Sequence, residues 1–153
     1  MDESRLDTSK TFIADLYLIR NGARSPIRIN DSGWLQAMQG QVLPTTLWFG
    51  CYQLEDGVGY IIKEYTKGGG RNGSVLSLNH NDYLGFYADA QRPWTIHHLD
   101  GRELVPQGTP EASVSISTKG GRRWTASGND FKALKGAGSE LFVHIHKIGV
   151  YRF

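Results

Sequence analysis

A pattern of apolar and aromatic residues recurs three times along the chain, at intervals of about 48 residues. Trp34, Tyr83 and Phe131 mark the three copies. The apolar residues at matching distances before these markers are Ile27 and Ile29, Leu76 and Leu78, and Trp124 and Ala126, and those after them are Ala37, Phe86 and Leu134. A fixed period of this length is typical of a repeated structural unit, so the chain is predicted to fold as three copies of one unit.

Each copy is predicted to consist of β-strands, because its apolar residues recur at every second position and successive strand residues point to opposite faces. A hairpin is predicted in each copy, at 27–35, 76–84 and 124–131, around a turn rich in Asn, Asp, Ser and Gly. Further strands are predicted before the hairpins, at 16–19, 60–62 and 114–116, and after them, at 47–49, 94–96 and 141–143. The pattern predicts twelve strands, with a glycine-rich loop inserted at 67–73.

Composition supports a single all-β domain over residues 1–153, because 39% of the residues are apolar and the chain contains 19 glycines and 5 prolines. The repeats are predicted at about 14–57, 58–108 and 109–153. An open solenoid or propeller is the alternative, but three units are few for a propeller and leave strand edges exposed. Closure around a pseudo-threefold axis buries the inward residues of all three units together.

The threefold recurrence of matching apolar positions resembles the pattern of the β-trefoil superfamily over residues 16–148. The resemblance implies six strands in a short barrel and six in three hairpins that cap one end. A jelly roll or a cytolysin-like sandwich would leave the register unexplained. The superfamily includes ricin-B-like and fungal lectins, fascins, protease inhibitors and cytokines, so the fold alone fixes no function. The triplets that match the Gln-x-Trp signature of its lectins are Thr46-Leu47-Trp48, Arg92-Pro93-Trp94 and Glu140-Leu141-Phe142, which keep the aromatic residue and lack the glutamine.

A sugar site needs an aromatic face for the pyranose ring and amide or carboxylate groups for its hydroxyls, and the second repeat offers the best supply of both. The predicted ligand-binding residues are Asn79, His80, Asn81 and Asp82 at the hairpin tip, Tyr87 and Asp89 after it, and Gln91 and Arg92 before Trp94. The corresponding residues are Asn30, Asp31 and Gln39 in the first repeat and Asn129, Asp130 and Lys135 in the third. The alternative interpretation is that the tip residues only form the turn and that Tyr87 is half-buried.

No metal, cofactor or catalytic site is predicted. His144 and His146 are two residues apart and are expected on one strand face, but no third metal ligand is evident, and His97 and His98 are expected to be ordinary strand residues. The sequence contains no nucleophile elbow, zinc-binding helix motif or phosphate-binding loop, so the protein is expected not to be an enzyme. Lys67, Arg71, Arg122 and Arg123 are expected on a solvated surface, and the alternative is that they form a modest basic patch.

The sequence predicts a non-enzymatic lectin that binds glycans or glycoproteins, in defence or another form of glycan recognition. Several repeats or a homodimer would supply avidity. The net charge of +2 does not favour nucleic acid, and no apolar run is long enough for a membrane span. The single cysteine, Cys51, is expected to be buried, and a cytoplasmic or non-classically secreted protein is expected because no signal peptide is evident. The alternative is a protein-binding trefoil, either a protease inhibitor or a fascin-like scaffold, with 104–110 as its contact loop; a toxin's receptor-binding part is a further alternative.

Overall fold

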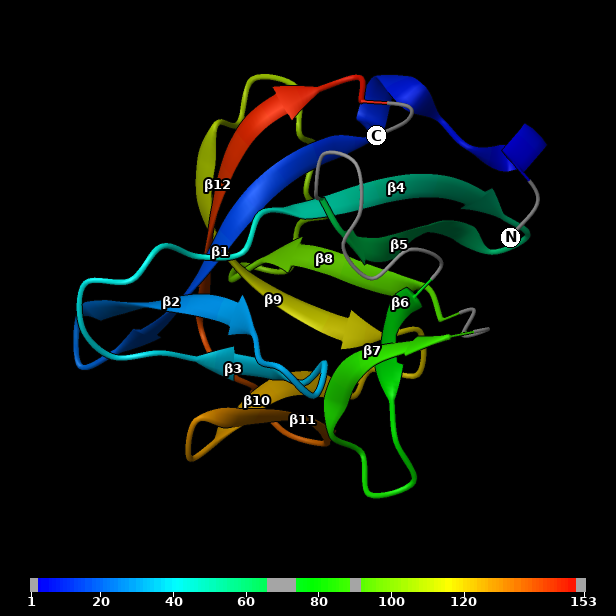
Figure 1. The fold of residues 1–153 in the computed structure, drawn as a ribbon. Coiled ribbons are helices and arrows are strands. Elements are labelled where there is room, and N and C mark those ends of the chain that lie inside the picture. Colours follow the sequence, from blue (N-terminus) through cyan, green and yellow to red (C-terminus); the bar gives the residue numbers. More distant parts are fainter. Residues whose placement is uncertain (1–2, 66–73, 89–91, 151–153) are drawn as a thin grey trace.

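The computed structural model describes residues 3–65, 74–88 and 92–150, and it is an all-β fold (Figure 1). Its strands are β1 (Phe12–Arg20), β2 (Ala23–Ile29), β3 (Leu35–Ala37), β4 (Leu47–Leu54), β5 (Gly57–Glu64), β6 (Ser74–Leu78), β7 (Leu84–Ala88), β8 (Trp94–His98), β9 (Glu111–Thr118), β10 (Arg123–Ser127), β11 (Asp130–Leu134) and β12 (Leu141–Ile148). Two short 3₁₀ helices, η1 (Glu3–Arg5) and η2 (Thr8–Lys10), precede them. None of the described helices has the length and apolar character to cross a bilayer.

The predicted strands are confirmed: each predicted segment overlaps one of the twelve observed strands. Alternation explains this success where one strand face is buried, as in Phe12–Leu18 of β1, whereas β4 to β7 contain continuous buried runs. The insertion predicted at 67–73 lies outside the described residues.

Six of the strands form a closed circuit of antiparallel pairs. β1 pairs with β4 and β12, β5 pairs with β4 and β8, and β9 pairs with β8 and β12. The other six form the hairpins β2–β3, β6–β7 and β10–β11, which lie together at one end of the molecule (Figure 1). Closure leaves the six circuit strands without a free edge along the paired segments.

The hairpins are joined to one another by one contact that is made three times. In each case a backbone N–H of one hairpin donates to a carbonyl at the tip of the preceding hairpin, and the first hairpin donates to the third. The three bonds are Phe86 N to Gly33 O at 2.7 Å, Ala133 N to Asp82 O at 3.0 Å, and Ala37 N to Asn129 O at 2.9 Å. Isolated pairs Trp34–Gly85 and Tyr83–Lys132, and the pair Gln36–Asp130, accompany them. The three hairpins therefore contact one another in equivalent ways.

These contacts correct the predicted register of the third repeat by one residue. The equivalent hairpin pairs are Ile29–Leu35, Leu78–Leu84 and Ala126–Phe131, so Phe131 is equivalent to Leu35 and Leu84. Asp130 takes the place that Trp34 and Tyr83 occupy in the other repeats. The reason is a turn shorter by one residue in the third hairpin. As a consequence Ala133 is buried, whereas Leu134, which was predicted to point inward, is 36% exposed.

The main core lies where the circuit meets the three hairpins. Equivalent residues from all three repeats meet there, each at most 1% exposed: Ile27, Leu76 and Trp124 from one strand of each hairpin, and Leu35, Leu84 and Phe131 from the other. Trp124 also packs edge-on against Trp94, with 5.5 Å between the ring centroids. The three hairpins thus contribute to one core that they share with the circuit.

Cys51 lies in β4 as a free thiol with no exposed surface, which confirms the prediction that it is buried. Burial raises the pKa of Cys51 from 9.0 to about 11, and a hydrogen bond with Tyr60 lowers it in part. The unfolded chain therefore loses this proton at a lower pH than the folded chain.

The stability of the fold should consequently depend on the ionisation of Cys51. We expect the contribution of this thiol to be complete below pH 9 and to be lost as pH rises through about 11. The free energy of unfolding should fall over that range by up to about 1.4 kcal/mol per pH unit. Urea unfolding on both sides of pH 9 measures this slope, with Cys51→Ala as the control. An equal slope in both proteins would contradict the prediction.

Candidate functional site

The predicted residues at the tip of β6–β7 first of all build the turn. The Asn79 side-chain oxygen accepts hydrogen bonds from the backbone N–H groups of Asn81 and Tyr83, at 2.9 and 3.0 Å. Asn30 forms the same two bonds in the first hairpin, with Ser32 and Trp34. Asparagine recurs at this position because its side chain closes a turn of this length.

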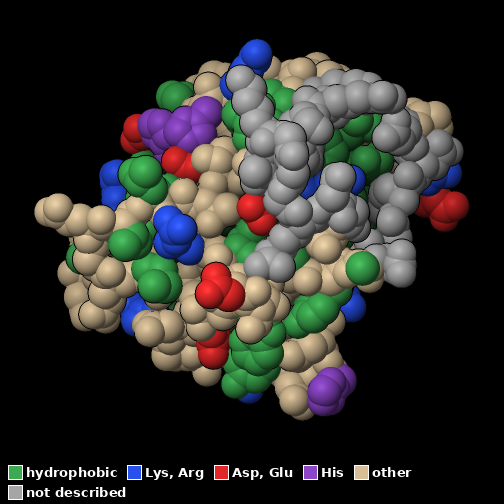
Figure 2. Space-filling view, viewed as in Figure 1, with side chains coloured by type: hydrophobic (Ala, Val, Ile, Leu, Met, Phe, Trp, Pro, Cys, Tyr) green, Lys and Arg blue, Asp and Glu red, His purple; other side chains and the backbone are tan. Residues whose placement is uncertain are grey.

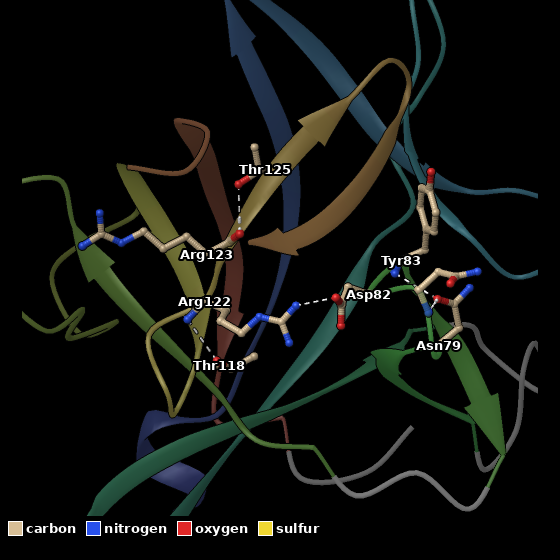
Figure 3. Close-up of polar contacts among 8 residues, drawn as sticks. Asn79, Asp82, Tyr83, Thr118, Arg122, Arg123 and Thr125 are labelled. Carbon is tan, nitrogen blue, oxygen red and sulfur yellow. Dashed lines mark hydrogen bonds and ion pairs between the residues drawn. The ribbon is translucent and has the colours of Figure 1, made fainter. Parts of the chain in front are cut away.

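Asp82 connects the second repeat to the third (Figure 3). Its carboxylate lies 2.6 Å from the guanidinium of Arg122, and the hydrogen bond with Arg122 holds the pKa of Asp82 below its ordinary value. Asp82 has a φ of 68°, a conformation that Asp tolerates better than most residues. Figure 3 also shows that the neighbouring Arg123 points away from this ion pair.

Three other predicted ligand-binding residues lie in the part of the chain that the structure describes: Tyr87, Arg92 and His80. The Tyr87 ring is half-buried, and its hydroxyl lies so close to Gly85 that a Cβ there would be 2.9 Å away. Arg92 donates from Nε to the Ser77 hydroxyl at 3.2 Å, and His80 is exposed. Asp89 and Gln91 lie outside the described residues. A sugar site at this tip therefore stays a prediction.

The histidines of β12 share one strand face, as predicted, with 4.9 Å between their ring centroids. Each has a carboxylate partner: His144 Nδ1 lies 3.2 Å from Glu111 and His146 Nε2 lies 2.7 Å from Asp15. Figure 2 shows histidine atoms beside acidic atoms on the side of the molecule that carries β12. Within residues 3–65, 74–88 and 92–150, no group of three or more His, Cys, Asp or Glu is placed to hold a metal ion.

The loop at 104–110, proposed above as a protein-binding loop, is anchored at both ends. Leu104 is buried and its N–H donates to Ile96 O of β8, while Pro110 O accepts from Ile145 N of β12. Val105 between these anchors is 53% exposed. The loop therefore presents the Val105 side chain between two backbone anchors.

An open pocket of about 380 Å³ lies on the outer face of β8 and β9. Its base consists of side chains that alternate with the inward residues of these strands: Thr95, His97, Ser115 and Ser117. The rest of its wall is formed by His98, Leu99, Gly101, Thr118, Lys119, Gly121, Arg123 and Ala137. The pocket thus lies between the second and third repeats, on strands whose other face belongs to the core.

The groups in this pocket are mainly hydrogen-bond donors and acceptors. The hydroxyls of Thr95 and Ser117 are 2.7 Å apart, and either of them can be the donor. Arg123 donates from Nη1 to the carbonyls of Gly136 and Ala137, at 3.4 and 3.2 Å. Lys119 forms an ion pair with Asp56 at 2.7 Å. The backbone of the surrounding loop holds the Arg123 side chain at the pocket wall.

Strand pairing shows why the pocket occurs at this position. Three circuit strands begin at equivalent residues, which are Leu47, Trp94 and Leu141. Each of these residues pairs with the strands on both sides and is at most 1% exposed. The next residue in each strand points to the outer face. These three equivalent outer residues are Trp48, Thr95 and Phe142, which pair with Lys63, Ser117 and Tyr17 respectively.

Aromatic rings fill the two equivalent positions. Phe142 packs near Tyr17, with 6.3 Å between ring centroids, and the Arg24 guanidinium lies 3.9 Å above the Phe142 ring. Trp48 lies so close over Gly50 that a Cβ there would be 2.2 Å from the ring, and the Lys63 ammonium is 5.5 Å from its centroid. At the third position Thr95 and Ser117 are small, and the space remains open.

This equivalence corrects the alignment of the three predicted lectin triplets. Trp94 was matched with Trp48 and Phe142, but Trp94 points into the core and is equivalent to Leu47 and Leu141. Thr95 and the other pocket residues were therefore missed. Alternation within residues 94–98 contained the signal, because Trp94 and Ile96 form one apolar face and leave Thr95 and His97 on the other.

Comparison of the chain with protein-family models, with curated proteins and with solved structures finds no match in any of the three.

Proposed function

We propose that the chain is a carbohydrate-binding β-trefoil that holds a saccharide in the pocket on β8 and β9. The trefoil assignment is supported by the closed circuit of six strands, the three hairpins at one end and the contact that recurs between hairpins. These are the features that the resemblance in sequence implies.

The observation that carries the proposal is a polar pocket at the one outer position that no aromatic ring fills. Its volume lies within the range of about 300–1,000 Å³ that is usual for small-ligand sites. The hydroxyls of Thr95, Ser115 and Ser117 offer donors and acceptors that match those of a sugar. Leu99, 55% exposed at the edge, offers an apolar surface for the C–H side of a pyranose ring. Because paired strands carry the base of the pocket, these groups are preorganised.

A binding role without catalysis fits the same residues. Glycoside hydrolysis usually requires two carboxyl groups on either side of the scissile bond. No carboxyl group is among the described residues that line the pocket. We therefore propose recognition of glycans or glycoproteins, with a homodimer as a means of avidity.

Glycan-array screening followed by titration in solution tests this proposal. We expect binding in the micromolar to millimolar range, with amide chemical-shift changes concentrated at Thr95, Ser115 and Ser117. His80→Ala, at the hairpin tip, is the control and should keep the affinity.

Two results would contradict the proposal. Absence of binding to any glycan at millimolar concentration would remove the carbohydrate function, and inhibition in a protease panel would then favour the protein-binding alternative with its Val105 loop. Shift changes confined to Asn79–Asp82 would place the site at the hairpin tip instead of the pocket.

A further inference from the structure

The cations at the three outer positions of the circuit differ in what they contact. Arg24 lies over Phe142, and Lys63 lies over Trp48, so each of these cations faces an aromatic ring. Arg123 belongs to the third position, where Thr95 and Ser117 leave the space open. Its guanidinium therefore borders a hollow that no Trp, Tyr or Phe ring of the described residues lines.

Within the described part of the chain, Arg123 is also the cation of the pocket for which no carboxylate partner is present. Lys119 is paired with Asp56, and the neighbouring Arg122 is paired with Asp82 on the opposite side (Figure 3). Among the described residues, the contacts of the Arg123 guanidinium are two backbone carbonyls, which leave its positive charge uncompensated. His97 and His98 add two imidazoles to a lining whose described residues include no acidic group.

We infer that the ligand of this pocket is an acidic saccharide whose carboxylate or sulfate group is bound by Arg123. This inference rests on the proposed carbohydrate function and specifies its ligand class. A guanidinium forms short, paired hydrogen bonds with such groups, and these are stronger than its bonds with neutral oxygens. The carbonyls of Gly136 and Ala137 hold Nη1, which leaves the remaining N–H donors of Arg123 for the anion.

A single acidic group fits this pocket better than a long polyanion. The net charge of the chain is only +2, and Lys119 and Arg122 are already paired with carboxylates. A nucleic-acid strand needs a row of uncompensated cations along its phosphates, whereas one sugar acid needs a single guanidinium beside hydroxyl groups. The pocket provides the second arrangement.

Paired sugars that differ only in the acidic group test the inference: methyl glucuronide against methyl glucoside, and galactose 6-sulfate against galactose. We expect the wild-type protein to bind at least one acidic member about tenfold more tightly than its neutral partner, with an affinity that falls as salt increases. Arg123→Gln should remove this preference. Arg122→Gln, whose side chain points away from the pocket, should keep it, and thermal unfolding of both variants checks that they fold.

The outcomes separate the inference from the proposed function. Equal affinity for acidic and neutral sugars, or a preference that persists in Arg123→Gln, would overturn the inference and leave carbohydrate binding intact. Competition by inorganic sulfate at the concentration of the sugar acid would overturn it as well, because the site would then recognise an anion alone. Binding of no sugar of either kind would contradict the proposed function itself.

Discussion

Replacing Trp94 with alanine is expected to lower the free energy of unfolding by about 3–5 kcal/mol. The Trp94 side chain has no exposed surface, packs edge-on against Trp124 and donates from Nε1 to Leu76 O at 3.1 Å. Trp94 also pairs with Tyr60 of β5, and this is the strand pairing of the circuit with the fewest paired residues. Its truncation removes core contacts from the second and third repeats together.

Urea unfolding of matched variants measures this effect. Trp34→Ala makes the same change at a half-buried position, where the ring stacks on Tyr83 with 5.0 Å between centroids, and it should cost clearly less. Domains of this size are stable by about 5–15 kcal/mol, so Trp94→Phe, which keeps most of the ring volume, provides a folded variant for comparison. Equal losses for Trp34→Ala and Trp94→Ala would contradict the placement of Trp94 at the core.

The strands of this protein were predictable because burial of one strand face imposes a local pattern on the sequence. Apolar residues at every second position, as in Leu76 and Leu78, are needed wherever one face of a strand is buried. The same rule places Cys51 inside the fold. The register of the third repeat was not predictable from the spacing of aromatic residues alone. Phe131 is equivalent to Leu35 and Leu84, and not to Trp34 and Tyr83, because the turn before it is one residue shorter.

The candidate site was harder to predict than the strands for a physical reason. A hairpin tip collects Asn and Asp because they close turns, so polar residues such as Asn79 and Asp82 mark folding chemistry as readily as ligand chemistry. The pocket, in contrast, exists because Thr95 and Ser117 are small at a position where the other repeats have aromatic rings. That difference becomes visible only after the strand pairing has fixed which residues are equivalent.

Filling the pocket with the residue that the first repeat carries at the same place should abolish ligand binding. Thr95→Trp puts an indole on the outer face of β8, as Trp48 does on β4, and we expect the affinity for the bound saccharide to fall by about a hundredfold. The fold should tolerate the change, because Thr95 is only partly buried and its equivalents Trp48 and Phe142 are aromatic.

Thr95→Ser is the matched control for this variant, since it keeps the hydroxyl and leaves the pocket open, and it should bind within about threefold of the wild-type affinity. Titration of the strongest glycan from the array, together with urea unfolding, compares the three proteins. Wild-type affinity in a folded Thr95→Trp variant would show that the ligand binds elsewhere.

The reciprocal change, Phe142→Thr, should leave Arg24 beside an open space. It therefore tests whether the aromatic ring is what closes the equivalent position.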